Sequence, residues 1–264
     1  MLELKNISKT FNAGTVNQKV ALNGLNLTMN EGDFVTVIGG NGAGKSTMLN
    51  AIAGVFQVDT GKILIDGVDV TALPEYKRAK YIGRVFQDPM MGTAATMQIE
   101  ENLALAARRG KPRTLRPGIT KADREFDKEQ LRILDLGLED RMTTKVGLLS
   151  GGQRQALTLL MATLQQPKLL LLDEHTAALD PKTAAKVLEL SDRIVRENEL
   201  TAMMITHNMK DAIVHGNRLI MMNEGRIILD IEGEEKQHLT KRDLLDKFAE
   251  VAGMQVESDE VLLS

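Results

Sequence analysis

Hydrophobic residues occur along this chain in short runs that alternate with longer stretches of helical spacing. That alternation predicts the α/β class with a mostly parallel sheet. The first third is rich in predicted strands, which cover residues 2–11, 20–29, 34–38 and 61–65. The last of these strands ends at Asp66-Gly67, a dipeptide that signals a hairpin turn.

The pattern changes between residues 90 and 148, where strict alternation disappears and helical spacing takes over. Two basic stretches that contain proline, 108–113 and 116–118, interrupt this region. We therefore predict a helical insert between two strand-rich parts of the chain.

The α/β pattern returns after residue 150. The predicted elements are a helix over 151–164, a strand over 169–172, a helix over 181–198, a strand over 201–206, a hairpin of 218–222 with 226–229, and an amphipathic helix from Leu239. Because 169–172 is apolar on both faces, we expect a central buried strand there. Asp180 as N-cap and Pro181 at the first position mark a helix start. The chain shows no internal repeat, which predicts one unit and not a tandem pair.

Composition narrows the possible functions. Of the 264 residues 43% are hydrophobic, enough for a sizeable core, and 33 Lys and Arg against 36 Asp and Glu give a net charge of −3. This balance argues against a polybasic nucleic-acid binder. The absence of cysteine excludes disulfides, thiolate catalysis and Cys-based metal sites. We expect no secretory signal, because residues 1–6 lack an apolar run, and no membrane span, which needs about 18 apolar residues.

The segment 39–46 reads GGNGAGKS and fits the phosphate-binding pattern G-x-x-x-x-G-K-[ST]. Glycines let backbone N–H groups surround phosphate oxygens, and the following helix directs its positive end toward them. Lys45 would reach the β- and γ-phosphates, and the Ser46 hydroxyl would bind Mg²⁺. The candidate nucleotide contacts are Gly39, Asn41, Gly42, Ala43, Gly44, Lys45, Ser46 and Thr47. A plain glycine-rich turn is the alternative interpretation.

An acidic pair, Asp173-Glu174, follows the predicted buried strand. An aspartate at the end of such a strand can hold Mg²⁺ directly or through water. The adjacent Glu174 would polarise a water for attack on the γ-phosphate. Alone, the pair is equally well an ordinary strand-end cap, but together with the glycine-rich loop it indicates a phosphate site.

The motif Leu149-Ser150-Gly151-Gly152-Gln153 begins a predicted helix. The chain resembles the ATP-binding subunits of ABC transporters in this motif and in the order of all three motifs. The resemblance extends over essentially the whole length of the chain. The resemblance implies a P-loop nucleotide-binding fold with an antiparallel β subdomain and an inserted helical subdomain. It also implies that two copies sandwich two ATP molecules, so that Ser150, Gly151, Gly152 and Gln153 of one copy contact the ATP bound by the other. A second helix N-terminus would supply positive potential there.

On this basis we predict a single ABC ATPase domain over residues 1–264. Its parts are a nucleotide-binding core of 1–89 and 151–232, a helical subdomain of 90–150 and a C-terminal helical extension of 233–264.

Three further positions match the family residue by residue. Gln87, after a predicted strand over 81–86, matches the glutamine that senses Mg²⁺ and the attacking water. His207 matches the histidine that contacts the γ-phosphate at a strand end. Phe11 matches the aromatic residue under adenine, a contact worth roughly 1–3 kcal/mol by analogy with base stacking. A polar loop residue, a structural histidine and a core phenylalanine are the respective alternatives.

The resemblance therefore implies catalytic roles for Lys45, Gln87, Glu174 and His207. It implies Mg²⁺ ligation by Ser46, Gln87 and Asp173, with ATP and Mg²⁺ as the cofactors. The run His175-Thr176-Ala177 departs from the family's Pro-Thr-Ser. His175 would either form a hydrogen bond near the γ-phosphate or replace a rigid turn, and Ala177 lacks a hydroxyl that usually contacts the neighbouring subunit.

The function implied is ATP hydrolysis that powers a membrane transporter. The single nucleotide unit and short C-terminal extension resemble those of the importer type. The run 173–184 resembles that of a poorly characterised importer-like group, which implies a small solute such as an amino acid. The implied partners are a second copy, transmembrane permease subunits and an extracytoplasmic solute-binding protein, and no nucleic acid. The implied location is the cytoplasmic face of the membrane. The alternative is a soluble ABC-type ATPase in DNA repair or translation, which would usually carry long coiled coils or two fused nucleotide units.

A basic stretch and several methionines are further features of the sequence. The basic stretch 108–116 predicts a solvated surface loop, with contact to a membrane-domain loop or anionic lipid as the alternative. Met90, Met91 and Met97, close to Gln87, predict an adaptable apolar contact surface. Pairs of methionine at 203–204 and 221–222 lie on predicted strands and are expected in the core.

Overall fold

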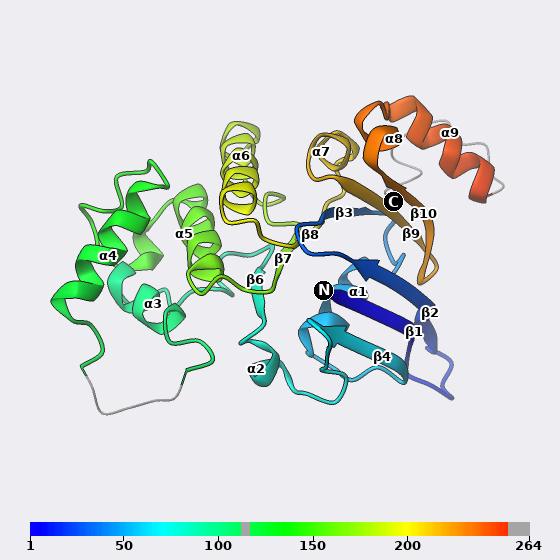
Figure 1. Ribbon diagram of the computed structural model, residues 1–264, viewed down its shortest axis with the longest axis horizontal. Helices are drawn as coiled ribbons and strands as arrows, with labels where there is room; N and C mark the ends of the chain where they lie inside the picture. Colours follow the sequence, from blue (N-terminus) through cyan, green and yellow to red (C-terminus); the bar gives the residue numbers. More distant parts are fainter. Residues whose placement is uncertain (112–116, 253–264) are drawn as a thin grey trace. The chain divides into compact units, whose positions relative to one another are not determined.

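The computed structural model describes residues 1–111 and 117–252, and the chain divides into two compact units. We call the described residues of 1–78 and 200–264 the terminal unit, and residues 79–199 the central unit. In the terminal unit the first strands, blue in Figure 1, lie beside strands from the end of the chain, drawn in orange. The predicted division at residues 90 and 150 stays a prediction.

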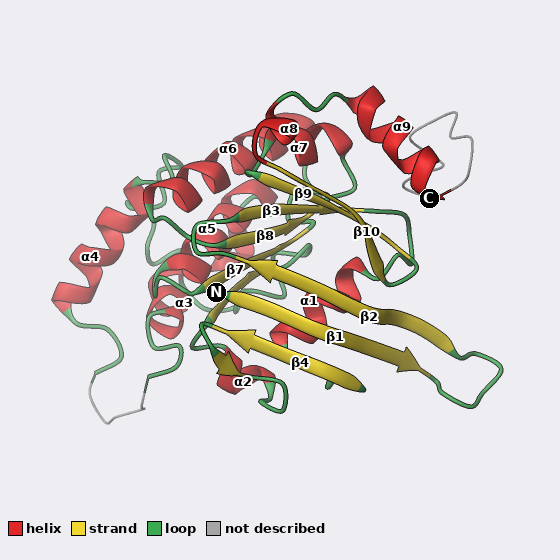
Figure 2. Cartoon of the chain, turned by 45° about the vertical axis from the view of Figure 1, so that its right-hand side comes forward, coloured by secondary structure: helices red, strands yellow, loops and turns green. Residues whose placement is uncertain are grey.

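An antiparallel sheet forms much of the terminal unit. It contains β1 (Leu2–Phe11), β2 (Lys19–Met29), β4 (Thr60–Ile65) and β5 (Val68–Asp69) in the order β2-β1-β4-β5. Figure 2 shows these strands as a broad ribbon with α1 (Lys45–Ala53) alongside. Asp66 and Gly67 turn the chain between β4 and β5 with φ of 54° and 75°, which confirms the predicted hairpin.

A second set of strands in this unit surrounds β3 (Phe34–Ile38), in which every residue is buried. On one side β3 pairs in parallel with β8 (Ala202–Ile205), and on the other with β9 (Arg218–Asn223). The hairpin partner of β9 is β10 (Arg226–Glu232). The methionines at 203, 204, 221 and 222 are all buried, as their strand positions predict.

The remaining helices of the terminal unit are α2 (Glu75–Arg78), α7 (Met209–Val214), α8 (Gly233–Gln237) and α9 (Lys241–Ala252). The amphipathic α9 packs Leu244 and Phe248 into a cluster with Ile38 and Met221, which confirms the predicted C-terminal helix. The short α8 lies within the predicted C-terminal extension of 233–264, but it was not predicted as a separate helix because its sequence GEEKQ contains no hydrophobic residue to reveal a helical period.

Arg78 is almost completely buried at the end of α2. Its guanidinium donates to the carbonyl oxygens of Ala51 at 2.7 Å and Ile52 at 2.9 Å, both in the last turn of α1. Two further bonds reach the carbonyls of Leu73 and Thr71. Burial lowers the pKa of Arg78, but a guanidinium stays charged at neutral pH. A buried cation therefore stabilises the negative end of the α1 dipole.

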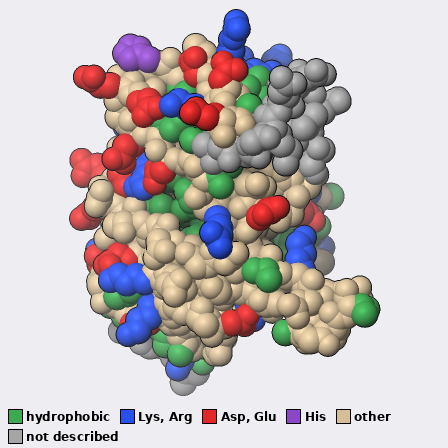
Figure 3. All heavy atoms as spheres, turned by 90° about the vertical axis from the view of Figure 1, so that its right-hand side faces the viewer, with side chains coloured by type: hydrophobic (Ala, Val, Ile, Leu, Met, Phe, Trp, Pro, Cys, Tyr) green, Lys and Arg blue, Asp and Glu red, His purple; other side chains and the backbone are tan. Residues whose placement is uncertain are grey.

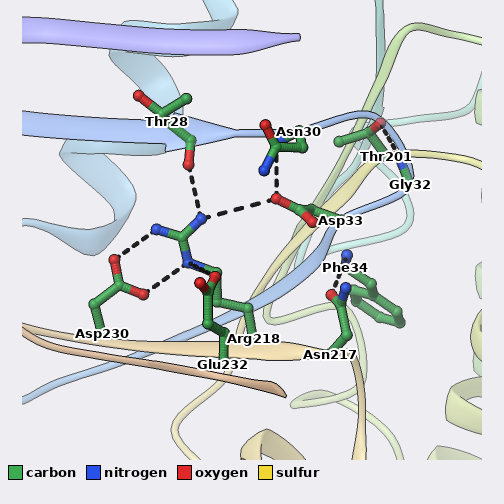
Figure 4. A network of polar contacts seen from close by, with 10 residues as sticks. All are labelled: Thr28, Asn30, Gly32, Asp33, Phe34, Thr201, Asn217, Arg218, Asp230 and Glu232. Atoms are coloured by element: carbon green, nitrogen blue, oxygen red, sulfur yellow. Dashed lines mark hydrogen bonds and ion pairs between the residues drawn. The ribbon is translucent and has the colours of Figure 1, made fainter.

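Arg218 joins β9 to its neighbours in the network of Figure 4. Its guanidinium binds the Asp230 carboxylate of β10 through two hydrogen bonds of 2.6 and 2.7 Å. A third bond, of 2.8 Å, reaches the carbonyl oxygen of Thr28 on β2. The bidentate pair, a favourable geometry for arginine, joins the two strands of the C-terminal hairpin, and the bond to Thr28 connects that hairpin to the N-terminal sheet.

The central unit contains the parallel pair β6 (Ile82–Val85) and β7 (Leu169–Asp173). Its helices are α3 (Ile99–Ala106), α4 (Lys121–Arg132), α5 (Gly151–Thr163) and α6 (Pro181–Glu197), with a short 3₁₀ helix at Val146–Leu148. The helical character predicted for 90–148 is confirmed by α3 and α4. Asp180 caps α6 by accepting a hydrogen bond from the Thr183 N–H at 3.1 Å, as predicted.

Surface properties agree with the charge balance. On the face shown in Figure 3, acidic and basic side chains are interspersed and no continuous basic area is visible. None of the helices in the described ranges combines the length and apolarity that crossing a membrane requires.

Asp127 is a buried carboxyl group on α4. Burial, with smaller contributions from the carboxylates of Asp123 and Glu100, raises its pKa to about 6. The Glu100 carboxylate itself is paired with Arg124 through bonds of 2.8 and 3.1 Å. A carboxyl group whose pKa is higher in the folded than in the unfolded state makes folding less favourable once both states are ionised.

We predict that Asp127→Asn raises the free energy of unfolding by on the order of 2 kcal/mol above pH 7, because the amide has no charge to bury. The wild type gains stability from this group below its unfolded pKa of about 4 and loses it as the pH rises through about 6. The difference between the two proteins should therefore vanish near pH 4. Urea unfolding across this pH range, with the exposed Asp140→Asn as control, measures it. A difference that does not depend on pH would contradict this account.

Candidate nucleotide-binding site

The glycine-rich loop connects the buried strand β3 to helix α1, which is the context that the sequence motif requires. Lys45, the first residue of α1, is only 7% exposed. Its Nζ donates to the carbonyl oxygens of Gly39 at 2.6 Å and Gly40 at 3.0 Å. The lysine ammonium is thereby held under the loop.

Two glycines of the loop are required by close backbone contacts. A Cβ on Gly39 would stand 2.2 Å from the Met222 carbonyl oxygen, and one on Gly44 would stand 2.6 Å from the Ala21 carbonyl oxygen. Both residues also have positive φ, 145° and 104°, which other residues rarely adopt. Gly225 supports the loop by donating its N–H to the Ala43 carbonyl oxygen at 2.9 Å.

The N-terminus of α1 lacks the usual side-chain cap. Its N-cap is Gly44, no side chain accepts a hydrogen bond there, and the first turn has no acidic residue. Ser46 is exposed and Thr47 is half-buried in the same turn. The N–H groups and positive dipole end of a helix bind anions such as phosphate, so this end of α1 has the chemistry of a phosphate site.

His207 lies at the same sheet edge as the loop. Strands β3 and β8 pair in parallel, with Val37 opposite Ile205. Gly39 lies two residues after Val37, and His207 lies two residues after Ile205. The Thr206 N–H donates to the Val37 carbonyl oxygen at 3.1 Å and extends the pairing. His207 is exposed, an arrangement compatible with ligand contact.

Phe11 is the last residue of β1 and is half-buried, so it is not a core residue. Its ring contacts Phe56 edge-on, with the centroids 5.3 Å apart. The Lys9 ammonium lies 5.7 Å from the Phe11 centroid and pairs with Asp59 at 2.7 Å. A braced aromatic ring with accessible surface is suited to stacking on a base, and the adenine contact stays a prediction.

In the central unit the strand register brings Gln87, Asp173 and Glu174 to one edge. Val85 pairs with Leu172 in parallel, so Gln87 and Glu174 each follow their paired residue by two positions. Gln87 is exposed, whereas Asp173 and Glu174 are half-buried. These side chains are therefore neighbours at the carboxyl ends of adjacent strands, where ligands bind in open α/β sheets.

Arg84 on β6 is a site residue that the sequence did not reveal. Its Nη2 lies 3.2 Å from Asp173 Oδ2. Burial raises the pKa of Asp173, the Arg84 cation opposes that effect and Glu174 adds to it. The available signal was a charged residue inside a strand of otherwise apolar character, but its partner becomes evident only from the parallel pairing of β6 with β7.

The signature residues 150–153 begin α5, as predicted. Ser150 Oγ accepts from the Gln153 N–H, and the Gln153 side-chain oxygen accepts from the Ser150 N–H, both at 3.2 Å. This reciprocal pair is a capping box. Gly152 packs closely against α6, since a Cβ there would stand 2.2 Å from Thr183 Cγ2 and the threonine side chain would have to move.

The first departure from the family pattern has a structural explanation. His175 is buried, and its Nε2 lies 2.9 Å from the Ser191 hydroxyl of α6. That hydroxyl donates in turn to the Val187 carbonyl oxygen. His175 therefore connects the turn after β7 to α6.

The basic stretch 108–116 is described in part, because residues 112–116 lie outside the described ranges. Arg109 donates to the Ala162 carbonyl oxygen at 2.9 Å, and its burial lowers the pKa of its guanidinium. Arg108 donates to the carbonyl oxygens of Pro117 and Gly118. These two arginines therefore stabilise the fold.

Comparison with known proteins identifies the family to which the chain belongs. Residues 22–177 match the family described as ABC transporter. A tyrosine transport ATP-binding protein of Clostridioides difficile (strain R20291) is 45% identical, over 94% of this chain and 98% of that protein. A spermidine/putrescine import ATP-binding protein of Haemophilus influenzae (strain ATCC 51907 / DSM 11121 / KW20 / Rd) is 34% identical over 87% of this chain, which spans only 57% of that protein.

Among solved structures, a dimeric ATP-binding cassette in a post-hydrolysis state, bound to ADP and phosphate, superimposes with a TM-score of 0.75. It is 31% identical in sequence, and the match covers 88% of this chain and 98% of that one. The glycine-rich loop, the acidic pair and the signature occur here in one cassette of the same fold. The chain belongs to the ABC transporter family, and it is an ATP-binding cassette with the ATPase activity of that family.

Proposed function

We propose that this chain hydrolyses ATP at the cytoplasmic face of a membrane and drives the import of a small solute, with an amino acid as the favoured class. The observation that carries the proposal is the uncapped N-terminus of α1 with Lys45 held beneath its glycine-rich loop. The 45% identity to a protein named for tyrosine transport favours an amino acid. The named solute of the Haemophilus influenzae relative is a polyamine, so the cassette itself does not specify the solute.

The partners proposed are transmembrane permease subunits and an extracytoplasmic solute-binding protein. Next to Gln87, Met90 is 42% and Met91 is 70% exposed. Exposed methionines form adaptable apolar contacts, so this segment is our proposed contact for the permease.

A second copy of the chain is the proposed partner for the signature. The Ser150 side chain is exposed at the N-terminus of α5. A helix N-terminus attracts phosphate, which supports a role for Ser150, Gly151, Gly152 and Gln153 in contacting the nucleotide of the other copy. A dimeric cassette among the similar structures supports the same arrangement.

In the proposed reaction the buried Lys45 ammonium holds the β- and γ-phosphates, and His207 contacts the γ-phosphate. Glu174 accepts a proton from the attacking water, a role for which a carboxylate is suited. The hydroxyl of Ser46, the amide oxygen of Gln87 and the carboxylate of Asp173 fit Mg²⁺, which prefers oxygen ligands. When bound, Mg²⁺ neutralises charge on the phosphates.

The transport function predicts that the protein purifies from its native membrane together with permease subunits. Met91→Glu should reduce that co-purification several-fold, because a charge would be placed in an apolar contact. Its ATP affinity should not change. The matched control is Val16→Glu, since Val16 is fully exposed on the terminal unit. Recovery of the wild type without any membrane protein would contradict the transport function.

Removal of the proposed base should separate binding from hydrolysis. We predict that Glu174→Gln lowers the ATPase rate at least about 100-fold, within the range that general-base loss produces, and leaves ATP affinity within twofold. Size-exclusion chromatography with ATP should then show a stable dimer. The control is Glu189→Gln, which makes the same substitution at an exposed residue of α6. Unchanged turnover in Glu174→Gln would exclude this residue as the base.

The signature is tested by Ser150→Arg. A bulky cation at this helix start should abolish hydrolysis and ATP-dependent dimerisation while ATP binding by the monomer stays normal. Ser150→Ala separates steric blocking from the loss of the cap, which costs about 1 kcal/mol. Equilibrium binding and ATPase assays measure both variants. If Ser150→Arg weakens ATP binding by the monomer, the signature does not act on the other copy.

A further inference from the structure

A second lysine lies over the phosphate loop. Lys19 is the first residue of β2 and is exposed. Its Nζ stands 3.1 Å from the point where a Cβ on Gly42 would lie. Among the residues that the structure describes, none forms a hydrogen bond or ion pair with the Lys19 side chain. The sequence motif gave no indication of this residue, because it lies outside the glycine-rich segment.

The position of Lys19 is set by the path of β2 along the loop. Ala21, two residues further along β2, brings its carbonyl oxygen within 2.6 Å of the Cβ position of Gly44. Ala21 is itself buried. The start of β2 thus runs along the loop, with the Ala21 backbone against Gly44 and the Lys19 ammonium against Gly42.

The strand register also links Lys19 to the aromatic residue. Lys19 pairs directly with Phe11 across β1 and β2. Residues directly opposite in an antiparallel pair project their side chains to the same face. The cation at the loop and the ring proposed for the base therefore share one face of this sheet.

The charges around the loop are one-sided. The ammonium groups of Lys45 and Lys19 and the positive end of α1 converge on it, and the first turn of α1 contains no acidic side chain. Like charges placed together in this way are stabilised by a bound anion. A polyphosphate in the loop supplies that charge.

We propose that Lys19 is a nucleotide-contacting residue whose ammonium group binds a phosphate oxygen of the ATP or ADP held by the loop. The proposal rests on the ATP-hydrolysing function above and adds a second lysine to its site. In this arrangement Lys19 neutralises phosphate charge from the solvent side, while Lys45 acts from beneath the loop.

The test compares binding of ATP and of inorganic tripolyphosphate by titration calorimetry. Lys19→Ala should weaken both about three- to fivefold at low ionic strength, as expected for an exposed charge pair. The loss should shrink as salt is added. Lys19→Arg should restore most of the affinity. Lys62→Ala removes an exposed lysine from β4 of the same sheet and should leave the affinity unchanged.

Two outcomes would overturn the inference. Affinity of Lys19→Ala within experimental error of the wild type would show that Lys19 does not contact the ligand. Weakened binding of ATP with unchanged binding of tripolyphosphate would show that the contact is not to phosphate. Lys45→Ala in parallel distinguishes the two proposals, because failure of that variant to weaken ATP binding would refute the phosphate site itself.

Discussion

The constraint on which this structure depends is the approach of backbone to backbone around the phosphate loop. The carbonyl oxygens of Met222 and Ala21 come so close to Gly39 and Gly44 that neither position can carry a side chain. Those carbonyls belong to β9 and β2, which lie in the last and first parts of the chain. Side chains at these two positions would clash with the backbones of both strands. The glycines are therefore needed for the packing of β2 and β9 against the loop.

Helix α1 shows how the two ends of one element can be given different tasks. At its C-terminus the guanidinium of Arg78 satisfies the carbonyls of Ala51 and Ile52. At its N-terminus neither a capping side chain nor an acidic residue opposes the dipole. A buried cation thus stabilises the negative end, whereas the positive end has the chemistry to bind an anion. Since Arg78 bonds to backbone atoms, its effect on the site acts through the position of the helix.

The sequence predicted elements well where the signal is local. Strand β3 and helix α6 were predicted from an apolar run and from an N-cap followed by proline, and both signals lie within a few residues. Neither Arg78 nor Arg84 was singled out from the sequence, and two alternatives stayed open for His175. Each is defined by a partner distant in sequence: Ala51 for Arg78, Asp173 for Arg84 and Ser191 for His175. The periodicity of hydrophobic residues contains no information about such pairs. A charged residue in a strand gives the same sequence pattern whether its side chain faces solvent or a carboxylate.

The division of the chain also separates the proposed tasks of the site. The residues that surround the polyphosphate, Lys45, Lys19 and the N-terminal turn of α1, belong to the terminal unit, whereas Gln87, Asp173, Glu174 and the signature belong to the central unit. Interactions made equally with substrate and transition state raise affinity without raising the rate of the chemical step. Loss of the exposed Lys19 should therefore change chiefly the affinity for nucleotide, whereas loss of Glu174 should change chiefly the rate of hydrolysis.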